Sequence, residues 1–183
     1  MILALSAVTH DIGCIVNRKK HNEISVRILG RPCFNFLRTY IGPLIYRALT
    51  QTIVAHSSKY KLKNVPEDPC PEIRLSFICT IFRLADACDL SGSRVKGLLL
   101  QVLIDEKAIK KKSEDIWHSH LNVENINIVG TTIKLNYYNQ RKAQYCLDCL
   151  EKELRPINAQ LKRLQYPPFV FQPRKVKRGV LVN

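Results

Sequence analysis

The spacing of the apolar residues changes part-way along the chain, and this change constrains the fold more than any other feature. In the segment 72–90, apolar residues recur every three or four positions, which is typical of a helix with one buried face. Further on, 125–128 and 133–137 alternate apolar and polar residues around Gly130, a pattern typical of a β-hairpin. The sequence therefore predicts a mainly α protein: a helical bundle followed by a small α+β extension.

The same reading gives the expected elements and their breaks. Helices are expected at 1–9, 21–29, 34–56, 72–90 and 94–103, interrupted by Gly30-Arg31-Pro32, by Gly42-Pro43 and by the loop that contains Pro66, Pro69 and Pro71. After the hairpin, apolar residues from Ala143 to Leu164 step by four and three, which predicts an amphipathic helix with a kink or break at Pro156.

This pattern predicts three segments. Residues 1–104 are expected to form the helical domain, and 105–166 the α+β extension. From Pro167-Pro168 onward the chain is basic, and we expect 167–183 to be a flexible tail. No internal repeats are evident in the helical part.

The composition suits a globular protein, but the charge is unusual. Hydrophobic residues make up 46% and charged residues 24%, while the formal net charge is +14. The positive charge gathers at 18–20, at 107–112 and at 174–178. Such charge favours anionic partners. It is weak support for nucleic acid, because no zinc-finger, homeodomain or RNA-binding signature accompanies it. A solvated face with a basic tail explains it as well.

The cysteines and the first residues bear on the compartment. The seven cysteines are odd in number and scattered, so we interpret them as reduced thiols. Cys146 and Cys149 match one half of a zinc or redox motif but lack a partner pair, and we interpret them as buried helix cysteines. The apolar segment 1–8 is too short to span a bilayer. A cytoplasmic protein without a membrane partner is expected.

A His-Asp doublet is the first chemical signal. His10 and Asp11 lie at the end of the first predicted helix, and Gly13 follows, where the backbone can turn freely. Adjacent residues on a helix lie about a hundred degrees apart around its axis. An imidazole and a carboxylate can therefore still reach one cation there. A capping or ion-paired histidine is the alternative for an isolated pair.

Three further residues join the doublet as candidates. Asp86 lies in an apolar helix, where burying a carboxylate is costly unless Arg83 or a metal ion compensates. His21 and His56 each lie at or near the end of a predicted helix, where a side chain can point into a cleft. Each of these histidines, taken singly, is more often structural than a metal ligand.

Taken together, these segments resemble a known family. The strings VTHDIG, HNEIS, IVAHSSKY and IRLSFICTIFRLADACDLSGSRV follow the order and spacing of HD-superfamily phosphohydrolases. The helix with RLADACDLSGSR, followed by IWHSHLNVENINI and a hairpin, looks most like the HD-CE group, whose HD domains carry a carboxyl-terminal extension and often occur beside GHKL-type chaperone-like ATPases. The resemblance covers about residues 1–165.

The resemblance assigns roles by position. His10 and Asp11 match the family's doublet and Asp86 its distal aspartate, while His21 and His56 match the histidines that hold a second metal. The family's first metal histidine lies upstream of the doublet, so we expect this chain to be a fragment or a truncated reading frame. His118 and His120 are only weak candidates to replace that first histidine.

The expected activity is hydrolysis of a nucleotide or another phosphate ester. Asp11 is the expected catalytic residue, and the expected cofactor is Mn²⁺, Fe²⁺, Ni²⁺, Co²⁺ or Mg²⁺. Candidate phosphate-binding residues are Arg18, Lys19, Lys20 and Lys59. Two alternatives stay open: a non-catalytic HD-like regulatory or interaction module, with a GHKL-type ATPase as a possible partner, and a basic nucleic-acid-binding protein.

Overall fold

The described residues divide into two compact units. The computed structural model describes residues 1–66, 72–92 and 97–177. The first unit contains Met1–Asp86 together with Ala159–Tyr166, and the second contains Ala87–Asn158 together with the chain from Pro167 onward. We expected the division near residue 104; in the structure the chain leaves the first unit at Asp86 and returns to it for one short segment.

The first unit is built from helices at nearly the expected positions. They are α1 Ile2–Thr9, α2 His21–Leu29, α3 Asn35–Ile41, α4 Pro43–Ala55 and α5 Leu75–Ala87, with short 3-10 turns at Ile12–Ile15, Arg18–Lys20, Pro32–Phe34 and Leu62–Asn64. The break at Gly42-Pro43 is confirmed: Gly42 adopts φ = +80°, and Pro43 opens α4 at its first turn, where its missing N–H costs nothing. Pro69 and Pro71 lie outside the described residues.

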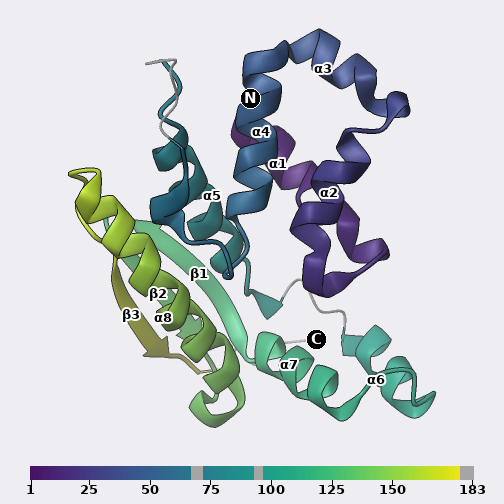
Figure 1. Ribbon diagram of the computed structural model, residues 1–183. Helices are drawn as coiled ribbons and strands as arrows, with labels where there is room; N and C mark the ends of the chain where they lie inside the picture. The colour runs from purple at the N-terminus through teal and green to yellow at the C-terminus, as the bar shows by residue number, and fades with distance from the viewer. Residues whose placement is uncertain (67–71, 93–96, 178–183) are drawn as a thin grey trace. The chain divides into compact units, whose positions relative to one another are not determined.

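Helix α4 is the centre of the first unit. It contacts α1, α2 and α3, and Figure 1 shows it running beside them. Leu29 of α2 and Leu49 and Ile53 of α4 form a buried cluster against which partly buried apolar side chains of neighbouring elements pack. The thiol of Cys79 on α5 donates to Thr52 Oγ1 of α4 at 3.7 Å, and both residues are fully buried. These contacts fix the helix ends that carry the histidines described below.

The second unit combines helices with a three-stranded sheet. Its elements are α6 Gly97–Asp105, α7 Lys111–Leu121, β1 Val123–Val129, β2 Thr132–Tyr137, α8 Gln140–Arg163, whose last turn belongs to the first unit, and β3 Val170–Lys175. The predicted hairpin is confirmed: β1 pairs antiparallel with β2, and Gly130 adopts φ = +57° in the turn. Of the expected helix 94–103, residues 94–96 lie outside the described part of the chain.

Helix α8 covers one face of this sheet. Ile133, Leu135 and Tyr137 of β2 share one face and are buried, as alternation along a strand requires. Figure 1 shows α8 lying along the sheet, and its buried residues recur at helical spacing: Ala143, Cys146, Leu147, Leu150, Leu154 and Ile157. The expected pairing of an amphipathic helix with the hairpin is therefore confirmed.

One expectation about the carboxyl-terminal part was wrong. Residues 170–175 are not a flexible tail: they form β3, which pairs in parallel with β2 from Val170 opposite Thr132 to Lys175 opposite Tyr137. At Pro156 we expected a kink or a break; there is no break, since α8 continues through that residue. A proline leaves the carbonyl four residues earlier without its helical donor. Here that is the carbonyl of Lys152, an exposed residue, so water can hydrate it.

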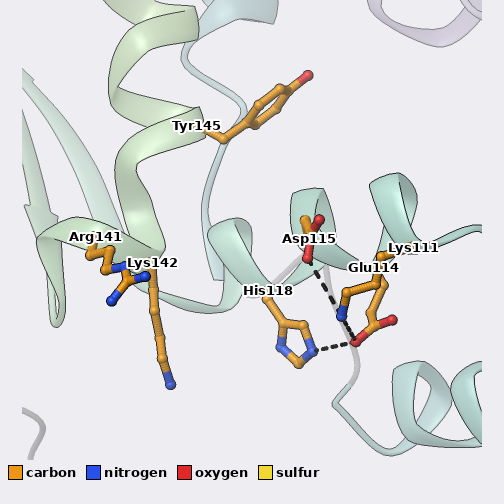
Figure 2. A pocket seen from close by; sticks show the side chains of 7 residues that line it. All are labelled: Lys111, Glu114, Asp115, His118, Arg141, Lys142 and Tyr145. Atoms are coloured by element: carbon orange, nitrogen blue, oxygen red, sulfur yellow. Dashed lines mark hydrogen bonds and ion pairs between the residues drawn. The ribbon is translucent and has the colours of Figure 1, made fainter.

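A pocket opens in the second unit between α7 and the start of α8 (Figure 2). It has a volume of about 450 Å³ and is open to solvent on one side. Most of the residues that line it carry charged groups on long aliphatic stems or rings: Lys111, Glu114, Asp115, His118, Arg141, Lys142 and Tyr145.

A helix that crosses a bilayer must be both long and apolar. Among the described residues, none of the helices combines the length and the apolar character needed to cross a bilayer. The expected mainly helical fold class is confirmed for this part of the chain.

Candidate metal centre

The His-Asp doublet is held by a tight turn after α1. His10 caps α1, and Asp11 precedes the 3-10 turn Ile12–Ile15. Gly13 lies against the start of α2 so closely that a Cβ there would stand 2.2 Å from the carbonyl oxygen of His21. The buried hydroxyl of Ser25 donates to the carbonyl of His10 at 2.6 Å and accepts from the N–H of Gly13 at 2.9 Å. The doublet is thereby fixed on both sides.

The two other histidines stand at the ends of neighbouring helices. His21 begins α2, and His56 follows the last residue of α4. The side chain of Asn22 is buried and donates to the carbonyl of Val54 at 3.1 Å, which joins the two helices beside these histidines. Asp86 comes from the penultimate position of α5. Three stretches that are far apart in sequence therefore deliver donors to one place.

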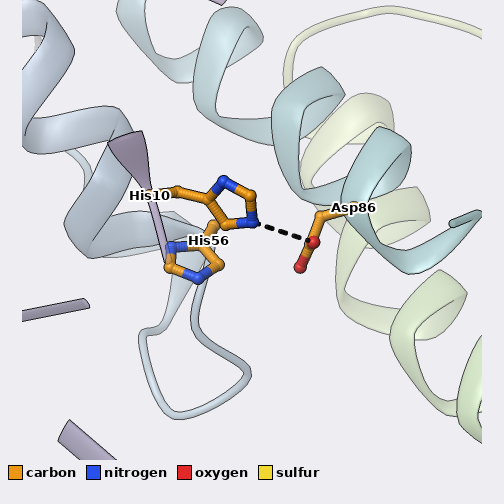
Figure 3. Close-up of side chains that lie close together, drawn as sticks. All are labelled: His10, His56 and Asp86. Carbon is orange, nitrogen blue, oxygen red and sulfur yellow. Dashed lines mark ion pairs between the residues drawn. The ribbon is translucent and has the colours of Figure 1, made fainter. Parts of the chain in front are cut away.

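The five predicted metal ligands lie together. The Nε2 atom of His10 is 3.4 Å from Asp86 Oδ1 and 3.5 Å from Asp11 Oδ2. On the other side, Asp11 Oδ1 is 3.4 Å from His21 Nε2 and 4.0 Å from His56 Nε2. Figure 3 shows His10 and His56 turned toward each other, with Asp86 facing His10. Two groups of donors result, His10–His56–Asp86 and Asp11–His21–His56, each with its ligand atoms within 4.8 Å of one another.

Backbone carbonyls set the tautomer of all three histidines. The Nδ1 atom of His10 lies 3.1 Å from the carbonyl of Ala7, that of His21 lies 2.8 Å from the carbonyl of Arg18, and that of His56 lies against the carbonyl of Ile53. A carbonyl only accepts, so each Nδ1 carries the proton and donates it. In a neutral ring Nε2 is then a bare lone pair, and these are the atoms that converge.

This arrangement fits a divalent cation. The Nε2 atoms of His21 and His56 are 2.8 Å apart, and two bare lone pairs at that distance repel unless a proton or a cation lies near both. Two adjacent ligands about 2.1 Å from one ion stand about 3.0 Å apart in octahedral and about 3.4 Å apart in tetrahedral geometry. The separations in the cluster therefore match joint ligation. The described residues can hold a metal ion here.

Burial and charge act differently on His10 and His56. A hydrogen bond with the Asp86 carboxylate raises the pKa of His10 above its ordinary value, although burial opposes the effect. Burial lowers the pKa of His56, whose residue is only 5% exposed. The ring of Phe82 on α5 lies edge-on against both imidazoles, with centroid distances of 5.4 Å and 6.2 Å. This apolar wall keeps water from one side of the cluster.

Of the predicted phosphate-binding residues, Lys19 and Lys59 are in contact in the structure. Asn17 Oδ1 accepts from the N–H groups of Lys19 and Lys20 and so caps the turn Arg18–Lys20. From the loop after α4, Lys59 Nζ donates to the carbonyl of Lys19 at 3.2 Å. The side chains of all four predicted cations are exposed. This turn runs directly into His21, so the cations lie on segments adjacent to two of the metal-site histidines.

The remaining candidates do not belong to this cluster. His118 and His120 lie on α7 in the second unit, where His118 Nε2 is 3.7 Å from Glu114 and His120 Nδ1 is 3.0 Å from the carbonyl of Leu90. Cys146 is buried on α8 and bonded to Ser119, as expected for a helix cysteine. Among the described residues, the groups able to hold a metal are the two named above.

Three residues beside the cluster were not predicted from the sequence: Ser25, Phe82 and Cys14. The thiol of Cys14 is partly buried, and its pKa is raised first by burial and then by the nearby charge of Asp11. Arg83, which we weighed as a partner of Asp86, is buried and donates from Nη1 to the carbonyl of Tyr60 at 2.9 Å. Ser25 had one signal in sequence, a small hydroxyl residue one turn after His21 on the buried face of a helix.

Comparison with known proteins adds no assignment to these observations. No family model matches the chain, and neither a curated protein nor a solved structure is significantly similar to it.

Proposed function

We propose that the first unit is an HD-type metal-dependent phosphohydrolase domain. One observation carries this proposal: three histidine Nε2 atoms, each with its Nδ1 turned to a backbone carbonyl, converge on the carboxylates of Asp11 and Asp86. A metal-ligating histidine usually donates its other ring N–H in this way, which orients the ring and makes the ligating nitrogen more basic. A purely structural histidine has no need of a second histidine nitrogen facing it.

The two oxygens of Asp11 suggest how the donors divide. Oδ2 faces His10, whereas Oδ1 faces His21 and His56. We propose that His10 and Asp86 would hold one ion, that His21 and His56 would hold a second, and that Asp11 would offer one carboxylate oxygen to each. His56 belongs to both groups of donors, but its single free nitrogen can serve only one ion. The bridging division assigns each imidazole nitrogen once.

The donor set favours particular metals. Imidazole nitrogens mixed with carboxylate oxygens suit Mn²⁺, Fe²⁺, Co²⁺ or Ni²⁺, with Mg²⁺ as a harder alternative. A divalent cation at such a site supplies Lewis-acid chemistry, because it acidifies a water molecule and polarises a phosphoryl oxygen. The chain's own residues orient this chemistry: Ser25 fixes the backbone of His10, and Phe82 excludes water from one side.

The substrate side of the proposal rests on the neighbouring cations. Arg18, Lys19, Lys20 and Lys59 lie on the segments next to His21 and His56. Phosphate groups of a nucleotide or another phosphate ester would bind there by charge-assisted hydrogen bonds. Of these residues, Arg18 is the strongest candidate, because its guanidinium can bind two phosphate oxygens at once.

The test combines metal content with activity. Purified protein is loaded with Mn²⁺, Fe²⁺, Co²⁺, Ni²⁺ or Mg²⁺, its bound metal is measured, and phosphate release is followed on a panel of nucleotides and simple phosphate esters. Asp11→Ala should lose both bound metal and phosphate release while keeping its circular dichroism spectrum. Asp148→Ala, a matched change at an exposed position of the second unit, should keep both.

Two outcomes would contradict the proposal. Unchanged metal binding in folded Asp11→Ala would refute the assignment of the ligands. Full metal content without hydrolysis of any phosphate ester would refute the enzyme and favour the non-catalytic HD-like module.

A further inference from the structure

The pocket of the second unit combines opposite charges on its two sides. Figure 2 shows Arg141 and Lys142, from the first turn of α8, on one side, with a cluster on α7 on the other. That cluster consists of Lys111, Glu114, Asp115 and His118. A volume of about 450 Å³ lies within the range of small-molecule sites, which is about 300–1,000 Å³.

The acidic groups of the pocket are already neutralised. Lys111 Nζ donates to Glu114 Oε1 at 2.8 Å and lies 3.7 Å from Asp115 Oδ1. His118 Nε2 approaches Glu114 Oε1 to 3.7 Å. Glu114 is the more sheltered of the two acids, with its side chain 20% exposed. The α7 side therefore offers carboxylate oxygens without a large net negative charge.

The cations on the other side have no such partner. Within the described ranges, the side chains of Arg141 and Lys142 form neither a hydrogen bond nor an ion pair, and the N–H of Lys142 is bonded to Asn139 Oδ1. Two adjacent unpaired cations repel each other, and an anion between them removes that cost. One more turn along α8, the ring of Tyr145 lines the pocket and is 44% exposed.

We propose that this pocket binds a nucleotide. Arg141 and Lys142 take the phosphate, the ring of Tyr145 stacks on the base, and Glu114 or Asp115 accepts from an exocyclic amine of the base. The inference goes beyond the proposed function and does not depend on the metal centre, since every residue it uses belongs to the second unit.

The combination of groups selects this ligand over others. Inorganic phosphate would contact the two cations but would not use the ring of Tyr145 or the carboxylate oxygens of the α7 side as ligand contacts. An acidic peptide is recognised by clusters of arginine side chains, whereas here the carboxylates of Glu114 and Asp115 face the cations across the pocket and would repel its acidic groups. A nucleotide joins the three matching features: an anion for the cations, a planar ring for stacking, and N–H donors for the carboxylates.

The test measures binding to the full chain without metal. Chelator-treated protein is titrated by calorimetry with ADP, with pyrophosphate and with an eight-nucleotide single-stranded RNA. Arg141→Glu/Lys142→Glu should weaken ADP binding about tenfold or more, the usual effect of removing charge-assisted bonds to phosphate. The matched control Lys134→Glu/Lys152→Glu changes the charge of the second unit equally at exposed positions outside the pocket, and it should bind ADP as the wild type does.

Tyr145 separates a nucleotide from a simple anion. Tyr145→Leu should weaken ADP binding several-fold and leave pyrophosphate binding unchanged, whereas Tyr145→Phe, which keeps the ring, should bind ADP like the wild type. Preference for ADP would identify a free nucleotide as the ligand. Preference for the RNA, with the same dependence on Arg141 and Lys142, would identify a nucleotide within a strand.

Three results would overturn the proposal. The first is equal weakening of ADP binding by the two double variants, which indicates non-specific attraction to a basic protein. The second is unchanged ADP binding in Tyr145→Leu. The third is that none of the three probes binds. None of these results bears on the metal centre, because the protein is metal-free throughout.

Discussion

Each unit of the molecule brings histidine and carboxylate side chains together, but the two clusters differ in how their charge is balanced. In the first unit, the ion-pair partners of Asp11 are all histidines: His10, His21 and His56. In the second unit, Glu114 pairs with Lys111 as well as with His118. The ammonium group of Lys111 supplies the positive charge that a metal ion would otherwise supply. The same residue types therefore suit a metal in one unit and a different kind of ligand in the other.

Burial sharpens the contrast. His56 is 5% exposed, and its Nδ1 is bonded to the backbone of its own helix. The side chain of His118 is 49% exposed, and its Nε2 faces Glu114 on the same helix. A buried imidazole with one nitrogen fixed presents the other in a defined direction, which is what a metal site requires. An exposed imidazole in an i,i+4 pair contributes little more than a surface ion pair.

The largest predicted effect is the loss of metal on replacing His56. His56→Gln removes the imidazole that belongs to both groups of donors and should weaken Mn²⁺ or Co²⁺ binding about 100-fold or more, since changing even an outer partner of a ligand costs 10–100-fold. Competitive metal titration measures it. Glu114→Gln should bind metal as the wild type does, so equal losses in both variants would end the distinction between the clusters.

The next largest effect concerns the glycine beneath the doublet. Gly13→Ala would place a Cβ 2.2 Å from the carbonyl oxygen of His21 and should lower the free energy of unfolding by about 3 kcal/mol, the upper end for overpacked sites. Gly97 has nothing within 4 Å of such a Cβ. Gly97→Ala should therefore leave stability unchanged or raise it by up to about 1 kcal/mol. Denaturant unfolding of the two variants makes the comparison, and equal effects would show that the contact at Gly13 is not essential.

Two buried serines test whether a positioning role can be separated from a structural one. Ser25 bridges His10 and Gly13, and Ser119 accepts from the N–H of Cys146 at 3.2 Å. Ser25→Ala should cost about 2 kcal/mol, because it leaves the N–H of Gly13 without its acceptor. Ser119→Ala should cost about 1 kcal/mol, because the N–H of Cys146 lies within α8 and keeps its helical acceptor. In the first unit, Ser25→Ala should also weaken metal binding about tenfold, while Ser119→Ala should not. Unfolding and metal titration on both variants decide it, and unaltered metal affinity in Ser25→Ala would make that residue merely structural.

The smallest effect is a pH dependence confined to the first unit. Burial lowers the pKa of His56, so its contribution to the stability of the metal-free protein is fully present above its unfolded value of about 6.5 and is lost as the pH falls below it. His10 acts in the opposite direction: the raised pKa that Asp86 gives it contributes stability that is present below about 6.5 and lost as the pH rises through the raised value.

The difference between wild type and His56→Gln isolates the first effect. Between pH 7.5 and 5.5 the wild type should lose stability relative to the variant, because only the wild type carries the buried imidazole with the lowered pKa. Hydrogen exchange should place this loss in α1, α2 and α4. Parallel pH profiles of the two proteins would contradict the buried, neutral state of His56.

Local signals made most helix positions predictable from sequence. Helix α2 begins at His21 and ends at Leu29 as expected, because Gly30 and Pro32 follow it. The strand β3 was not predictable in the same way. Pro167-Pro168 and the basic residues of 170–175 favour a tail, and the partner of this strand, β2, precedes it by a whole helix. A parallel pairing across such a distance leaves no short-range pattern in the sequence.

The candidate site was likewise predictable only in part: the residues could be predicted from sequence, but their atomic contacts could not. The pattern of His10, Asp11 and Asp86 predicted that these residues lie together, and the structure brings them together. What fixes their chemistry could not be predicted, since it depends on which backbone carbonyl each Nδ1 meets. The role of Ser25 likewise depends on α2 packing against the turn at Gly13, a contact that follows from the fold and not from spacing.

The short return of the chain to the first unit has a consequence for synthesis. Residues Ala159–Tyr166 belong to the first unit, where Tyr166 packs on Phe77 with ring centroids 4.5 Å apart and Arg163 donates to the carbonyl of Lys63. The first unit is therefore complete only when residue 166 has been synthesised, eighty residues after Asp86, the last of the proposed metal ligands. The sheet likewise waits for its last strand. A fragment that ends at residue 104 would therefore lack Ala159–Tyr166 of the first unit and most of the second unit.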